Sequence, residues 1–134
     1  MTDYLLDTNH AGRLVDPRHP VRVRVLAASA QGSAFYIVLP IITETVAGFS
    51  ILPRAVRNRA EWHIARGSLA LLDLDETDAL DAAALQVALR QRGRQLQTVD
   101  ALVAVAALCY DVILLTTDGD FATIAGLRQE NWVP

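Results

Sequence analysis

The sequence alternates short apolar runs with longer segments of helical spacing, and this alternation limits the folds open to it. The apolar runs cover residues 4–6, 34–39, 69–74 and 112–115, which are lengths typical of buried strands. Segments with helical patterns separate these runs. Strands that alternate with helices predict a mostly parallel sheet covered by helices on both faces. The length of 134 residues fits one α/β domain over residues 1–134.

Capping and turn residues predict the helix boundaries. His19-Pro20 and Gly32 bracket a helix over residues 20–30, because proline suits the first helical turn and glycine the position after the last. Further helices are predicted from Thr43-Glu44, from Pro53 to about Arg66, from Thr77-Asp78 to Gly93, from Thr98 to about Cys109, and over residues 121–125. Residues 132–133 are predicted as an edge strand.

Two of these helices have apolar residues at intervals of three and four, which predicts one buried face on each. On the helix after Thr77-Asp78, the expected inward positions are Leu80, Ala83, Ala84, Val87 and Ala88. On the helix after Thr98 they are Val99, Leu102, Val103, Ala106 and Cys109.

The basic residues exclude several classes of protein. All 12 are arginine, so a phosphate-binding loop, a Schiff-base lysine and a kinase site are absent. The net charge is -3, so a polyanionic partner must be held locally. No apolar run approaches the ~18 residues of a membrane helix, and the first residues resemble no secretory signal. With a single cysteine, Cys109, the chain is expected to be cytoplasmic.

Four acidic residues are predicted to meet at one edge of the sheet. Asp7 ends the first strand, and Asp118 follows the strand at residues 112–115. Glu44 follows the second strand, and Asp100 lies in the first turn of its helix. Helices run antiparallel to the strands in this architecture, so the first turns of the helices lie at the edge of the sheet where the strands end. This is the edge at which parallel sheets bind ligands.

Clustered carboxylates repel one another unless a cation neutralises them. Oxygen ligands without His or Cys favour Mg2+, with Mn2+ as an alternative, over zinc. Such a metal is suited to a phosphodiester, since it polarises the phosphoryl oxygen and activates water for attack. The pattern therefore favours phosphodiester hydrolysis.

Four motifs occur in an order that resembles the PIN-domain ribonucleases, and in particular the VapC-type toxin subunit of VapBC toxin–antitoxin systems. They are Leu6-Asp7-Thr8-Asn9, the isolated Glu44, Val99-Asp100-Ala101-Leu102-Val103-Ala104, and Leu115-Thr116-Thr117-Asp118-Gly119-Asp120-Phe121. The resemblance extends from Asp3 to about Trp132. It implies a PIN-like, Rossmann-like domain with four to five strands.

The resemblance also implies roles for individual residues. Asp7, Glu44, Asp100 and Asp118 would be the metal-binding carboxylates, with Asp7 and Asp100 nearest the principal ion. Asn9 and Thr116 would orient them by hydrogen bonding, and Asp120 would be an additional acid. The implied activity is Mg2+-dependent endoribonuclease cleavage that leaves a 5'-phosphate. The implied partners are the RNA substrate, a VapB-type antitoxin whose C-terminal segment blocks the acidic cleft, and a second copy of the chain.

Other interpretations of these residues stay open. Each acid taken alone could be a turn or helix cap, as we expect for Asp73, Asp75, Asp78 and Asp81. Arg13, Arg54 and Arg57 could contact RNA, or they could be solvated, with Arg57 paired to Glu61. His10 could touch substrate, although packing is the more common role.

Two alternative functions also remain. A HAD-like phosphatase has an Asp after its first strand, but it needs a second acid where this chain has Asn9, and it needs a basic group that is usually lysine. A catalytically inactive PIN-like module that binds RNA or protein would not need all four acids.

Overall fold

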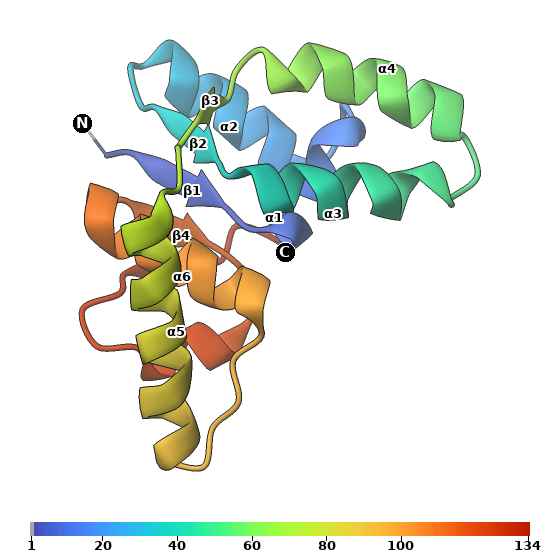
Figure 1. Cartoon of the computed structure of the whole chain (residues 1–134). Coiled ribbons are helices and arrows are strands. Elements are labelled where there is room, and N and C mark those ends of the chain that lie inside the picture. Colours follow the sequence, from blue (N-terminus) through green and yellow to red (C-terminus); the bar gives the residue numbers. More distant parts are fainter. Residues whose placement is uncertain (1) are drawn as a thin grey trace.

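The computed structural model describes residues 2–134, which form one parallel five-stranded sheet with helices around it (Figure 1). The strands are β1 (Tyr4–Leu6), β2 (Phe35–Ile37), β3 (Ala70–Leu71), β4 (Ile113–Leu115) and β5 (Gln129–Glu130). Their order in the sheet is β3-β2-β1-β4-β5, and every neighbouring pair is parallel. The predicted α/β class and strand number are confirmed.

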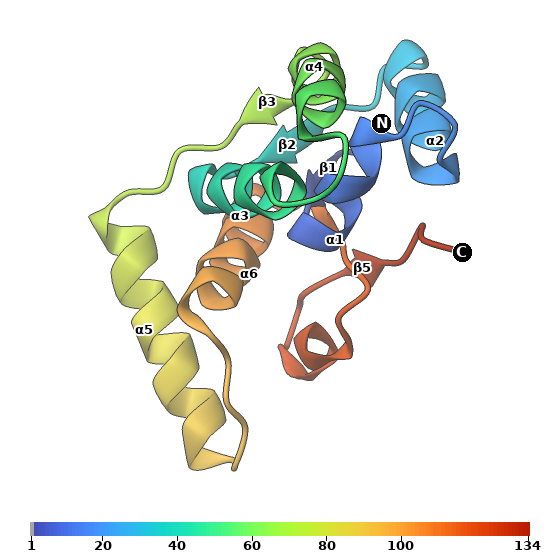
Figure 2. The same cartoon turned by 90° about the vertical axis from the view of Figure 1, so that its right-hand side faces the viewer.

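The helices connect successive strands. They are α1 (Thr8–Ala11), α2 (Pro20–Ala30), α3 (Leu39–Ser50), α4 (Ala55–Arg66), α5 (Glu76–Gln91) and α6 (Thr98–Tyr110), with 3-10 turns η1 (Gly12–Val15) and η2 (Gly119–Thr123). Figure 2 shows α2 on one side of the sheet and α5 and α6 on the other. No helix within residues 2–134 has the length and apolar character needed to cross a membrane.

The strand order reverses at β1, and this reversal determines where a site can form. From β1 the chain passes to β2 on one side, whereas β4 pairs with β1 on the other, with Leu6 opposite Leu115. The connections leaving β1 and β4 therefore depart in different directions, and in parallel sheets this position at the carboxyl ends of the strands is where ligands bind.

The core forms where α6 packs against the central strands. Six residues of α6 are buried, and all of them are alanine or valine. Small side chains allow the helix to approach the sheet closely. At the other end of β1, Tyr4 stacks on Phe35, and both rings contact Trp132 edge-on. The C-terminal segment is therefore anchored to the core.

Several predicted boundaries are confirmed and others are wrong. The helix over residues 20–30 matches α2, and His19 caps it as expected. The helix expected from Thr43 instead begins at Leu39, because Pro40 fits its first turn. The edge strand is residues 129–130 rather than 132–133, because the backbone N–H of Trp132 donates to His10 instead of to the sheet. The predicted helix over residues 121–125 is a 3-10 turn that starts at Gly119.

The face assigned to α5 is also wrong. The Asp75 carboxylate caps the helix by accepting from the Asp78 N–H, and the Asp78 carboxylate accepts from the Asp75 N–H. The capping role expected of these two acids is therefore confirmed. Ala82 and Leu89 are the buried residues, whereas the predicted inward set is exposed: Leu80, Ala83, Ala84, Val87 and Ala88. Cys109, expected in the core, is exposed and lies 3.8 Å from the Asp78 carboxylate. Hydrophobic spacing alone did not identify the side of α5 that contacts α6.

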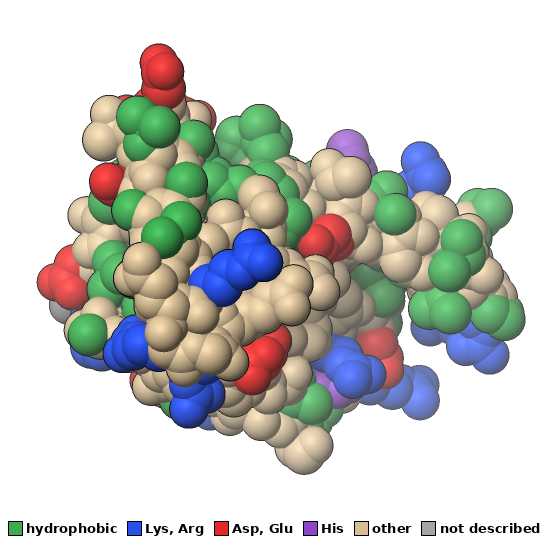
Figure 3. Space-filling model, turned by 60° about the horizontal axis from the view of Figure 1, so that its bottom comes forward, with side chains coloured by type: hydrophobic (Ala, Val, Ile, Leu, Met, Phe, Trp, Pro, Cys, Tyr) green, Lys and Arg blue, Asp and Glu red, His purple; other side chains and the backbone are tan. Residues whose placement is uncertain are grey.

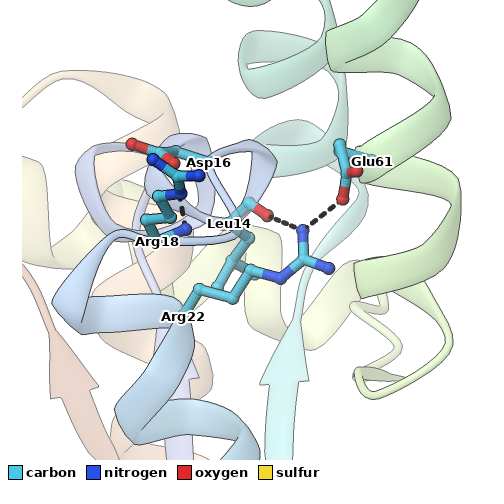
Figure 4. A network of polar contacts seen from close by, with 5 residues as sticks. All are labelled: Leu14, Asp16, Arg18, Arg22 and Glu61. Atoms are coloured by element: carbon cyan, nitrogen blue, oxygen red, sulfur yellow. Dashed lines mark hydrogen bonds and ion pairs between the residues drawn. The ribbon is translucent and has the colours of Figure 1, made fainter.

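An ion pair joins α2 to α4 (Figure 4). Arg22 donates to the Glu61 carboxylate at 2.6 Å and to the backbone carbonyl of Leu14 at 2.9 Å. The side chains of Arg22 and Glu61 are 11% and 22% exposed. Water can therefore replace the missing partner only in part if one member is removed.

We expect Glu61→Ala to lower the free energy of unfolding by roughly 1–3 kcal/mol in urea denaturation, because it leaves the Arg22 guanidinium half-buried without its carboxylate. The matched control is Arg128→Ala, which breaks the exposed Arg128–Asp111 pair and should cost less than about 1 kcal/mol. Equal losses in the two variants would contradict this interpretation.

Candidate functional site

The carboxyl ends of β1 and β4 bring together acidic residues that lie far apart in the sequence. Asp7 follows β1 and caps α1, accepting from the Thr8 N–H at 2.9 Å. Asp118 follows β4 and caps η2, accepting from the Asp120 N–H at 2.9 Å. Asp100 lies in the first turn of α6. Because β1 and β4 are neighbours, Asp7 and Asp118 leave the same edge of the sheet side by side.

Asp7 is the anchored member of this group. Its side chain is buried, and Oδ2 accepts from the Thr116 hydroxyl at 2.8 Å and from the Asn9 amide at 3.4 Å. The Thr116 oxygen in turn accepts from the Asp118 N–H at 3.0 Å. Thr116 therefore connects the turn that carries Asp118 directly to the Asp7 carboxylate. Asn9 and Thr116 lie where the sequence pattern places them, next to the carboxylate they would orient.

Glu44 reaches the same edge through a contact that the sequence analysis missed. The residue lies in the second turn of α3 rather than at its start, and its carboxylate accepts from the Thr8 hydroxyl at 2.6 Å. Thr8 thus binds two acids, Asp7 through its backbone N–H and Glu44 through its side chain. The sequence did contain a signal for this contact. Thr8 carries a hydroxyl directly after Asp7, at the edge where the strand ends, so it is placed to bind a second acid there.

Burial and mutual repulsion raise the pKa values of the two innermost acids. The pKa of Asp100 rises to about 6, first because burial disfavours its charged form and then because Asp7, Asp118, Glu44 and Asp120 repel it. Burial also raises the pKa of Asp7, and Glu44 and Asp118 add to that rise. Hydrogen bonds from Thr116 and Thr8 act in the opposite direction. Four other acids therefore lie within electrostatic reach of Asp100.

The donor set fits a hard divalent cation. It consists of carboxylate oxygens, and the like charges require a compensating positive charge. Within residues 2–134, no three His, Cys, Asp or Glu side chains stand ready to ligate a single ion together. Asp7 is held by hydrogen bonds, whereas Glu44 is exposed and Asp118 is half-buried. In this conformation the acids are therefore near one another without forming a ligand cluster.

His10 is fully buried and belongs to the hydrogen-bond network behind the acids. Its Nε2 accepts from the Trp132 N–H at 2.9 Å, and its Nδ1 lies 2.9 Å from the Asn9 Oδ1. Because Nε2 accepts, the proton is on Nδ1 and is donated to Asn9. Burial, followed by the charges of Arg13 and His19, lowers the pKa of His10 to about 4. The ring is therefore neutral at physiological pH and serves packing rather than substrate contact.

The arginines expected to contact RNA are exposed. Arg13 is in η1, Arg54 is in the turn before α4 with φ 67°, and Arg57 is in α4. Glu61 pairs with Arg22 rather than with Arg57. Figure 3 shows arginine side chains beside acidic ones across the lower end of the molecule.

Comparisons with known proteins support one family. The model of the PIN domain family matches residues 4–127. The structure is similar to VapBC2 of Rickettsia felis bound to a promoter DNA fragment, with a TM-score of 0.84, 23% identity, and coverage of 98% of this chain and 99% of that one.

Two further solved structures are similar. For DNA-bound VapBC of Salmonella typhimurium, the TM-score is 0.81, with 22% identity over 98% of this chain and 99% of the other. For VapC20 of Mycobacterium tuberculosis, described as a sarcin-ricin loop cleaving toxin, the TM-score is 0.69, with 16% identity over 92% and 95%. No curated protein sequence matches the chain with significance.

We expect Asp100→Asn to stabilise the protein at pH 8 in the absence of divalent cations. The pKa of Asp100 is raised from 3.8 to about 6 in the folded state, so the folded chain binds more protons than the unfolded chain between these pH values. The Asp100 contribution therefore lowers stability as pH rises through this window. Allowing for partial exposure, removing the charge should add roughly 1–2 kcal/mol at pH 8.

The gain should shrink at pH 4.5, where Asp100 of the folded wild type is mostly protonated, and thermal unfolding at the two pH values measures it. Asp73→Asn, on the exposed segment before α5, is the control for loss of one negative charge. A gain that is the same at both pH values, or a loss at pH 8, would contradict the repulsion inferred for the acidic cluster.

Proposed function

The chain belongs to the PIN domain family, and on this premise we propose that it is a Mg2+-dependent endoribonuclease acting as the toxin of a toxin–antitoxin pair. The observation that carries the proposal is the convergence of Asp7, Glu44, Asp100 and Asp118, where burial and then mutual repulsion raise the pKa values of Asp7 and Asp100. A fold has no structural reason to gather repelling carboxylates in a crevice. A cation-assisted reaction on a polyanion gives such a cluster a function.

The proposed role of each acid follows from the hydrogen bonds that hold its side chain. Asp7 receives hydrogen bonds on both carboxylate oxygens, so it provides a fixed point for binding the ion. Asp100, from α6, and Asp118, from the turn after β4, add the further negative charge that would attract the ion. Glu44, held by Thr8 at the exposed side, is suited to orient the attacking water. A bound Mg2+ or Mn2+ would supply positive charge to the phosphoryl oxygens and lower the pKa of water.

The phosphatase alternative receives less support from the residues around Asp7. Asn9 stands where such enzymes need their second acid, and the sequence contains no lysine. An inactive binding module would have no use for the full set of acids.

The proposed protein partner is a VapB-type antitoxin. Similar solved structures include VapBC assemblies bound to DNA, with coverage of nearly the whole of both chains. The acidic crevice is suited to a basic side chain, so a cationic C-terminal segment of the antitoxin would block it by occupying the position of the ion.

A homodimer is supported by the outward face of α5. Leu80 is 64% exposed and Val87 is 57% exposed, and the alanines between them are exposed as well. Such an apolar stripe on a helix surface is typical of an interface between subunits.

RNA cleavage tests the proposed activity. We expect the wild-type chain to cut RNA in Mg2+, to stop when EDTA removes the ion, and to lose at least ~100-fold in kcat/KM on Asp7→Asn. Asp111→Asn is the matched control, because Asp111 precedes β4 at the opposite edge of the sheet and asparagine tolerates its positive φ. Activity that survives EDTA or the Asp7 substitution would refute the mechanism.

Sedimentation velocity tests the dimer. Leu80→Glu should convert the wild-type dimer to a monomer, because it places a charge within an apolar contact. Val23→Glu introduces the same change on α2, where Val23 is 55% exposed, and should leave the dimer intact. If the Leu80→Glu variant still forms a dimer, the proposal that α5 forms the interface is wrong.

A further inference from the structure

A cleft lies between the end of α5 and the segment of residues 92–97 that leads into α6. It has a volume of about 610 Å3, and Gln86, Arg90, Arg94 and Gln95 contribute to its lining. Ala83 and Val87 line it as well, so the cleft adjoins the α5 face proposed above as the subunit interface. A second hollow of about 230 Å3 shares the segment from Gly93 to Leu96 and reaches Asp120 and Thr123. The two hollows together form a surface path from Asp120 to the arginines.

The segment that lines both hollows is fixed relative to the acids. Leu96 is buried, and its carbonyl accepts from the Gln86 amide at 2.9 Å. Gln86 also donates to the hydroxyl of Thr98, the first residue of α6, at 3.4 Å. Asp100 lies two residues further along. The positions of the arginines and of Asp100 are therefore set by the same short stretch of chain.

The charge of this stretch differs from that of the chain as a whole. Arg90, Arg92 and Arg94 are exposed and occur within five residues, although the net charge of the protein is -3. Within residues 2–134, none of the three forms an ion pair with an acidic side chain, whereas Arg22 and Arg128 do. Figure 3 looks onto this end of the molecule and shows arginine side chains projecting from it.

Guanidinium groups match phosphate oxygens in geometry and stay charged at every physiological pH. We propose that Arg90 and Arg94 bind backbone phosphates of the RNA strand next to the cleaved bond, so that the substrate runs from the acidic cluster along the α5–α6 connection. This inference rests on the proposed nuclease function. It explains how an acidic protein holds a polyanion, since attraction is confined to one groove beside the carboxylates.

The test is the double variant Arg90→Gln/Arg94→Gln, with Arg128→Gln as control. The control removes one arginine charge at the opposite edge of the sheet, where Arg128 contacts Asp111. The probe is a fluorescein-labelled 12-nucleotide oligouridylate, with binding measured by anisotropy in Ca2+ across a range of salt concentrations. Cleavage of the same RNA is followed in Mg2+.

For the double variant we expect Kd to rise at least ~10-fold and the slope of log Kd against log salt to fall by about 1.4, as for two lost phosphate contacts on a single strand. KM for cleavage should rise while kcat at saturation stays within about twofold, because the carboxylates are untouched. Arg128→Gln should resemble the wild type. A merely structural role would change the melting temperature instead, and would not change the salt dependence.

The outcomes separate the two proposals. If the wild type cleaves RNA and the double variant matches it in Kd and salt slope, the groove is refuted and the nuclease stands. If the arginine variant loses binding but the wild type does not cleave, the groove is supported and the proposed function fails. If the double substitution instead changes the oligomeric state in sedimentation, the cleft is an interface between copies and the inference is overturned.

Discussion

The site depends on the pairing of two parallel strands. Because β1 lies beside β4 in register, Asp7 and Asp118 leave the sheet next to each other, and α6 adds Asp100 in its first turn. Burial, followed by the repulsion among these acids, raises the pKa of Asp100 to about 6. The fold thus tolerates an unfavourable interaction, which under the proposed function a divalent cation would neutralise.

Neutral polar groups hold the charged ones in position. Thr116 and Asn9 bind Asp7, and the buried, neutral His10 ties Asn9 to the backbone of Trp132. Since Asn9 Oδ1 accepts from both His10 and the Thr117 N–H, its amide group must point its nitrogen towards Asp7. The C-terminal segment, which packs its indole against Tyr4 and Phe35, is in this way part of the support of the site.

Local sequence signals predicted those features that depend on nearby residues. Proline and glycine correctly predicted the bounds of α2. The apolar runs predicted β1 and β4, and with them the position of the acids that follow these strands. Features that depend on tertiary contacts were missed. The link from Thr8 to Glu44 joins residues 36 positions apart, and the outward face of α5 follows from which of its sides packs on α6. Hydrophobic spacing finds an apolar stripe, but a stripe that binds a partner has the same spacing as one that packs in the core.

Titration calorimetry with Mn2+ tests the central claim most directly, because ion binding must displace protons from acids whose pKa is raised. At pH 6, where Asp100 is about half protonated, we predict saturable binding whose heat depends on the ionisation enthalpy of the buffer, with this dependence nearly absent at pH 8. The buffer dependence should disappear in Asp100→Asn. Absence of saturable binding, or binding at pH 6 that releases no protons, would contradict a cation site formed by these converging carboxylates.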